Sequence, residues 1–193
     1  MNKFYIVRHG ETEWNKKRIC QGIVNNPLNE KGIKDAITLG RTLKELNLHF
    51  EVFVSSPLLR AIETMSLIKN ELENFSPIII NKGLIERNFG ELEGEDVDKV
   101  TNSIENGSCN NVKGFENDAK LIERVSSSFK EINSHYKDTN ILIVAHSHAI
   151  KAFLSYIDPS TYSFFTPLSN LNVSLIDGFE DNSFLVESLH FKK

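Results

Sequence analysis

Short runs of apolar residues recur along the chain, separated by longer segments in which apolar and polar positions are mixed. The runs consist of bulky or β-branched residues without polar alternation, which is typical of strands that are buried on both faces of a sheet. We therefore predict four buried strands, at Phe4–Val7, Val52–Val54, Ile78–Ile80 and Ile141–Ala145.

The segments between these runs carry apolar residues at helical spacing, so that one face of each segment is apolar. We expect helices over residues 29–46, with Asn29 as the cap, and over residues 57–68, 95–106, 117–136 and 147–157. Two further apolar runs, at residues 172–176 and 184–189, flank a polar turn and predict a hairpin. Strands that alternate with helices predict an α/β fold, a three-layer sandwich with a mainly parallel central sheet and helices on both faces.

The size and composition are those of a single globular domain. The chain has 193 residues, of which 40% are hydrophobic and 25% are charged. Its formal net charge of −4 argues against nucleic acid as a partner. An anionic ligand would therefore have to be attracted by a local cluster of positive groups rather than by the protein as a whole.

The sequence shows no sign of export or membrane insertion. Met1–Lys3 leads directly into the first predicted strand, and no apolar run approaches the roughly 20 residues that a membrane span needs. Cys20 and Cys109 lie far apart and lack the spacing of a metal site, so we expect two free thiols in a reducing compartment. We predict a cytoplasmic protein, a monomer or a homodimer, without a membrane partner.

Chemically capable side chains follow several of the predicted strands. Arg8 and His9 come directly after the first strand, His146 follows the fourth, and Arg60 lies in the first turn of the helix after the second. Open α/β sheets bind ligands at the carboxyl ends of their strands. A lone histidine at a strand end is more often structural, and a lone arginine in a first helical turn more often forms a surface ion pair. Together, an imidazole nucleophile and fixed guanidinium groups favour chemistry on a phosphoryl group.

Four blocks of sequence resemble the signatures of one family. In chain order they are Val7–Asn15, Ser55–Ala61, Leu84–Gly94 and Ile143–His146. Their residues and their order are similar to those of the histidine phosphatase, or phosphoglycerate-mutase-like, superfamily, and they span nearly the whole chain. The resemblance implies a single histidine-phosphatase-like domain over residues 1–193, with the phosphoglycerate-mutase-like α/β fold.

The resemblance also implies a role for each matching residue. His9 would be the nucleophile that becomes phosphohistidine, and Glu86 would protonate the leaving oxygen and then activate water. No metal and no cofactor are implied, because the arginines and the second histidine would supply the positive charge. The implied pocket for the phosphoryl oxygens consists of Arg8, Asn15, Arg60, His146 and Ser147.

The sequence departs from the family pattern in one place. The family usually has glycine directly after the second histidine, whereas here Ser147 and His148 follow it. Ser147 still offers a backbone N–H group and adds a hydroxyl. A second difference is the short span between Gly94 and Asn117, where mutases of the family carry extra segments that close over the substrate. The short span favours a phosphatase over a mutase.

We therefore predict a metal-independent phosphomonoester phosphatase that acts through a phosphohistidine on a small phosphorylated metabolite. A phosphoglycerate mutase is the first alternative. A metal-dependent hydrolase that uses His146 and His148 as ligands is a second, although it would place Arg8 beside the cation. A binder without catalysis would be marked by loss of His9 or Glu86, and both are present. The sequence leaves open which monoester is the substrate: a sugar phosphate, a phosphoglycerate, phosphoserine or α-ribazole phosphate.

Overall fold

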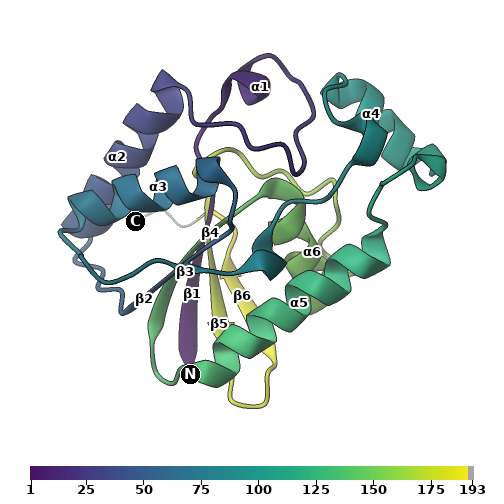
Figure 1. The fold of residues 1–193 in the computed structure, drawn as a ribbon. Helices are drawn as coiled ribbons and strands as arrows, with labels where there is room; N and C mark the ends of the chain where they lie inside the picture. Colours follow the sequence, from purple (N-terminus) through teal and green to yellow (C-terminus); the bar gives the residue numbers. More distant parts are fainter. Residues whose placement is uncertain (191–193) are drawn as a thin grey trace.

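A six-stranded sheet forms the centre of the computed structural model, which describes residues 1–190 (Figure 1). The strands lie in the order β3-β2-β4-β1-β5-β6. Neighbours from β3 to β1 run parallel, while β5 is antiparallel to both β1 and β6, so the sheet is mainly parallel as predicted. The strands are β1 (Asn2–Arg8), β2 (Val52–Ser55), β3 (Ile79–Ile80), β4 (Asn140–Ala145), β5 (Val173–Gly178) and β6 (Phe184–Ser188).

Helices cover both faces of this sheet (Figure 1). One face is covered by α2 (Glu30–Glu45) and α3 (Leu59–Glu71), and the other by α5 (Asp118–His135) and α6 (Ser147–Ile157). At the carboxyl end of β1 lie two smaller helices, α1 (Glu13–Lys16) and α4 (Val97–Glu105). Single 3-10 turns complete the fold at Lys82–Leu84, Gly90–Leu92 and Ser108–Asn111. No helix among the described residues is long and apolar enough to cross a membrane.

The first strand shows why its sequence lacks polar alternation. Phe4 and Ile6 face the core beneath α5 and α6, whereas Tyr5 and Val7 face the core beneath α2 and α3. Successive side chains of a strand point to opposite faces, so a strand between two helical layers must be apolar at every position. Burial of each such side chain contributes about 1.5–3 kcal/mol to the free energy of unfolding.

The helix boundaries agree with the predictions to within a few residues. Asn29 caps α2, and its side chain accepts a hydrogen bond from the backbone N–H of Gly32. Asn117 caps α5 in the same way, so this helix begins one residue later than predicted. Two helices begin two residues later than predicted: α3 begins at Leu59 rather than at Pro57, with Leu58 as its N-cap, and α4 begins at Val97 rather than at Glu95.

The prediction of a buried strand at Ile78–Ile80 was wrong. Only Ile79 and Ile80 form a strand, and they are 42% and 46% exposed. This strand pairs only with β2 and lies at the edge of the sheet. A short isoleucine run has the same sequence pattern at the centre and at the edge of a sheet, so the pattern alone could not show that this strand is exposed. The expectation for the cysteines is confirmed, because Cys20 and Cys109 are both free and buried.

Candidate active site

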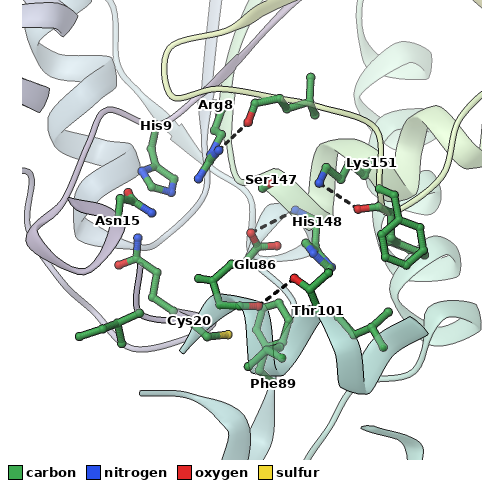
Figure 2. Close-up of a pocket in the computed structure, with 18 residues that line it drawn as sticks. Arg8, His9, Asn15, Cys20, Glu86, Phe89, Thr101, Ser147, His148 and Lys151 are labelled. Atoms are coloured by element: carbon green, nitrogen blue, oxygen red, sulfur yellow. Dashed lines mark hydrogen bonds between the residues drawn. The ribbon is translucent and has the colours of Figure 1, made fainter. Parts of the chain in front are cut away.

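A pocket of about 360 Å³ lies at the carboxyl ends of β1 and β4, beside α4 (Figure 2). Its apolar side comes from α4 and from residues 164–168. Arg60 and His146 are fully buried, contact His9 and do not line the pocket. The predicted site residues that do line it are Arg8, His9, Asn15, Glu86 and Ser147.

His9 is held by hydrogen bonds at both ring nitrogens. Its Nδ1 lies 2.7 Å from the carbonyl oxygen of Gly10. A carbonyl oxygen can only accept, so Nδ1 carries the proton and Nε2 keeps its lone pair. That lone pair accepts a hydrogen bond from Arg60 Nε at 3.2 Å. The ring is therefore fixed in the tautomer that a nucleophilic Nε2 requires.

The surroundings of His9 also keep it neutral. Its pKa lies well below the usual value, first because the ring is buried and then because Arg60 and Arg8 are positively charged. Burial and a nearby positive charge both disfavour the imidazolium form. The Nε2 lone pair is consequently available at neutral pH.

Gly10 lets the end of β1 pack directly against the start of α2. A Cβ atom at Gly10 would lie 2.9 Å from the carbonyl oxygen of Gly32, closer than any real contact of this kind. The Gly10 backbone N–H donates to Thr64 Oγ1 at 3.0 Å. The glycine thus permits a close approach of backbone to backbone, which fixes the residue that accepts from His9 Nδ1.

The two arginines differ in what they hold. Arg60 donates from Nη1 to the carbonyl oxygen of Val24 at 2.7 Å and from Nη2 to that of Gly22 at 2.8 Å. Its pKa is lowered to about 10 by burial, so it stays charged at neutral pH. Arg8 donates from Nη1 to the carbonyl oxygen of Leu168 at 2.5 Å. Its Nε is buried and has no hydrogen-bond partner among the described residues.

His146 lies beside His9, with 5.1 Å between the ring centroids. Its Nε2 forms a hydrogen bond of 2.6 Å with Ser56 Oγ. Its pKa also lies well below the usual value, because of burial and then of the positive Arg60. The sequence analysis did not predict the Ser56 contact, although Ser56 directly follows β2, the neighbour of β4.

Glu86 is fixed at the N-terminus of α6. Its Oε1 accepts from the backbone N–H groups of Arg87 at 2.8 Å and Ala149 at 3.1 Å, and its Oε2 accepts from that of His148 at 3.1 Å. The positive end of a helix favours a carboxylate at this position. These contacts hold the Glu86 carboxyl group against the pocket (Figure 2).

Asn15 presents its amide N–H₂ group to the pocket. Its Oδ1 accepts from the backbone N–H of Thr12 at 3.2 Å and from Asn170 Nδ2 at 3.3 Å. Since these donors occupy the oxygen, the amide nitrogen points away from them and toward the pocket that Asn15 lines (Figure 2).

Two residues of α6 that had no predicted role here also line the pocket, His148 and Lys151. The His148 ring stacks on Phe164 and meets Phe89 edge to face. Lys151 Nζ donates to the carbonyl oxygen of Phe164 at 2.9 Å. The sequence contained a signal that Lys151 lies near the site, because Lys151 is four residues after Ser147 and residues at this spacing share a helix face.

This arrangement weakens the metal-hydrolase alternative. His146 is directed at Ser56, whereas His148 lies between aromatic rings. Within residues 1–190, no group of three or more His, Cys, Asp or Glu side chains could hold a metal ion.

The short span between Gly94 and Asn117 forms one side of the pocket. It contains α4, whose Val97, Val100 and Ile104 line the apolar side. Val100 packs with Cys20 and Phe89 in a small cluster of its own. The span therefore supplies an apolar wall of the pocket despite its brevity.

Comparisons with known proteins agree with these features. The sequence profile described as "Histidine phosphatase superfamily (branch 1)" matches residues 4–190. The uncharacterized phosphatase PhoE of Bacillus subtilis (strain 168) is 33% identical over 184 residues, which cover 94% of this chain and 91% of that protein. The 2,3-bisphosphoglycerate-dependent phosphoglycerate mutase of Cytophaga hutchinsonii is 33% identical over 165 residues, or 79% of this chain and 76% of the mutase. A crystal structure of phosphoglycerate mutase from Bacillus anthracis str. Sterne superimposes with a TM-score of 0.85 at 26% identity, covering 96% of this chain and 91% of that one. The chain that carries His9 at the end of its first strand therefore belongs to the histidine phosphatase superfamily, as its four sequence blocks predicted.

Proposed function

We propose that this protein is a phosphomonoester phosphatase that acts through a phosphohistidine on a small phosphorylated metabolite. The observation that carries the proposal is the state of His9, which is neutral and keeps its lone pair on Nε2 beside two guanidinium groups. A phosphatase of Bacillus subtilis is among the relatives, which supports a hydrolytic reaction.

In the first step, the Nε2 lone pair of His9 attacks phosphorus and the bond from phosphorus to the ester oxygen breaks. Glu86 donates a proton to the leaving oxygen, and phosphohistidine remains. In the second step, Glu86 takes a proton from water, whose oxygen attacks phosphorus. Inorganic phosphate leaves and the electron pair returns to Nε2. Arg60 Nε, which donates to that lone pair in the structure, transfers its hydrogen bond to a phosphoryl oxygen during the first step.

The positive groups around His9 supply most of the catalysis in this scheme. Phosphoryl transfer depends mainly on positioning and on stabilisation of charge at the phosphoryl oxygens. Arg8 offers a buried Nε donor that has no partner within residues 1–190, and Asn15 offers its amide. The backbone N–H of Ser147 at the start of α6 adds the positive end of a helix.

Phosphoglycerate mutase is the second candidate. It is favoured by the relatives of that activity and by α4, because the wall that α4 adds to the pocket helps to retain a product long enough for it to be phosphorylated again. The two reactions separate with 3-phosphoglycerate as substrate. We expect inorganic phosphate to appear faster than 2-phosphoglycerate; the reverse order, above all after priming with 2,3-bisphosphoglycerate, would identify a mutase.

A screen of phosphate release from alkyl and aryl monoesters tests the proposal, with His9→Ala as the control. The wild-type enzyme should turn over, form a phosphoenzyme that is labile in acid and stable in alkali, and lose activity with vanadate. A chelator should leave the rate unchanged. The proposal would be rejected if His9→Ala, shown to be folded by circular dichroism, retained substantial turnover, or if activity disappeared with chelator and returned with a divalent metal.

A further inference from the structure

Lys151 is a positively charged group in the pocket that the proposed reaction does not use. Figure 2 shows Lys151 and His9 on opposite sides of the pocket, with Glu86 between them. The Nζ of Lys151 donates one hydrogen bond, to the carbonyl oxygen of Phe164. An ammonium group has three donors, so two remain. Within residues 1–190, no carboxylate forms an ion pair with Lys151.

The surroundings of Lys151 disfavour an isolated cation. The adjoining wall is apolar and includes Phe165 and Leu168. The pKa of Lys151 is lowered to about 8, chiefly by burial and then by the positive Arg8, with Glu86 opposing the shift. A half-buried ammonium without a counter-ion loses part of its hydration free energy, and one hydrogen bond to a carbonyl oxygen compensates for little of this loss. An anion in the pocket would compensate for this loss.

Attachment of the Phe164 segment to α6 does not require a charge. A neutral amide would donate the same hydrogen bond, whereas the ammonium adds only the ability to bind an anion. The position of the Lys151 ammonium group suits contact with the leaving group of a substrate. When the phosphoryl group of a substrate contacts His9, its leaving group would extend past Glu86 toward Lys151.

We propose that Lys151 binds a second negatively charged group of the substrate, so that the preferred substrates are phosphomonoesters with a carboxylate or second phosphate a few bonds from the ester oxygen. This inference rests on the proposed phosphatase function and identifies its substrate class. Lys151 thereby determines specificity, while the chemistry stays with His9 and Glu86.

The test compares matched substrates that differ only in the second charge. For the carboxylate, the pair is 3-phosphoglycerate and glycerol 3-phosphate; for the phosphate, it is propane-1,3-diol bisphosphate and 3-hydroxypropyl phosphate. The measured quantity is the ratio of kcat/KM for the charged substrate to kcat/KM for its uncharged partner. The proposal is supported by a wild-type ratio above one for the carboxylate pair, or above two for the phosphate pair, because the bisphosphate carries two equivalent ester groups. After division of the second ratio by two, the pair with the larger ratio identifies the anion.

Replacement of the lysine should reduce this ratio. For Lys151→Met we expect a fall of about tenfold or more, mainly through KM, since hydrogen bonds to charged groups are worth roughly that much in affinity. Lys151→Gln, which keeps a donor for Phe164, should lose the preference as well, and Lys151→Arg should retain most of it. The matched control is Lys120→Met, which removes an equal charge from an exposed position outside the pocket.

The pH dependence separates binding from a structural role. The preference for the charged substrate should decline as the pH rises through about 8, where Lys151 loses its proton, and a lysine that only attaches the Phe164 segment would leave the ratio constant. If the wild-type enzyme hydrolyses p-nitrophenyl phosphate but Lys151→Met and Lys151→Gln leave both ratios unchanged, the inference is wrong and the phosphatase function stands. If the wild type hydrolyses no monoester at all, the proposed function itself is wrong.

Discussion

Arg60 Nε donates a hydrogen bond to His9 Nε2, so the arginine fixes the orientation of the lone pair that the proposed reaction uses. The same guanidinium is anchored by the carbonyl oxygens of Gly22 and Val24. It is therefore fixed at the point where a phosphoryl oxygen would arrive when His9 attacks. In the proposed reaction, one cation would thus both orient His9 and stabilise the charge that develops beside it.

Arg60→Met should reduce kcat/KM for any monoester by about a hundred- to a thousandfold, the usual loss when one charge-stabilising donor is removed. Arg60→Lys, which keeps the charge but lacks the planar fork that reaches His9 and both carbonyl oxygens at once, should lose less. Steady-state kinetics with p-nitrophenyl phosphate provide the measurement, and thermal melting checks the fold. A change below threefold in the folded Arg60→Met variant would show that Arg60 is only structural.

His9 should be neutral well below pH 6.5. Burial and the charges of Arg60 and Arg8 hold its pKa low, and its Nδ1 donates to Gly10. Nitrogen-15 NMR of the histidine rings should therefore show the neutral Nδ1–H tautomer at pH 6.5. In Arg60→Met the removal of a positive charge should move the pKa of His9 upward. An imidazolium at pH 7 in the wild-type protein would contradict the assignment.

Acid should destabilise the fold through its buried histidines. The pKa values of His9, His146 and His148 all lie well below 6.5, mainly because of burial. Below pH 6.5 the unfolded chain binds protons that the native state does not bind, so the free energy of unfolding falls as the pH decreases. The melting temperature should therefore drop between pH 7.5 and pH 5.

A variant at His148 tests this linkage. His148→Phe should flatten the pH dependence, because it keeps the contacts with Phe89 and Phe164 and removes an Nδ1 that is buried without a partner. His49→Gln, at an exposed position, should leave the slope as in the wild type. Equal slopes in all three proteins would mean that His148 does not contribute.

The sequence alone predicted those parts of the fold for which the pattern of buried residues and the order of elements along the chain allow only one arrangement. The run Phe4–Val7 within β1 is apolar at every position, so it was expected to lie between two helical layers. His9 and His146 follow two strands that pair with each other in the sheet. The run at Ile79–Ile80 has the same composition but lies at an edge, and only the strand order decides this. Residue type and local period carry no information on strand order.

The site was predictable to the extent that its residues stand in recognisable blocks. Arg8, His9, Asn15 and Glu86 line one pocket, although their roles remain predictions. Lys151 was missed because it lies outside these blocks, in the middle of an ordinary amphipathic helix. Its relevance comes from the segment around Phe164, which folds back on α6 and supplies an apolar wall. The spacing from Ser147 places Lys151 on the same helix face, but that this face borders the pocket depends on tertiary packing.

The role of Glu86 can be tested through the leaving group. An alkyl phosphate leaves as an unstable alkoxide unless it is protonated, whereas p-nitrophenyl phosphate leaves as a stabilised phenolate. Since general-acid catalysis contributes about a hundred- to ten-thousandfold, Glu86→Gln should slow alkyl phosphates far more than p-nitrophenyl phosphate. The readout is the rate of phosphoenzyme formation in a single turnover, because loss of the later base role can make hydrolysis of the phosphoenzyme limiting.

The aryl substrate also controls for structural damage in this variant. The carboxylate of Glu86 accepts from the backbone N–H groups of Arg87, His148 and Ala149, and a glutamine side chain has only one oxygen to offer them. Some disorder at the start of α6 is therefore expected, and it should slow both substrates by the same factor. Only loss of the proton donor slows the alkyl phosphate in addition. If phosphoenzyme formation falls equally for both substrates, Glu86 positions α6 without acting as the acid.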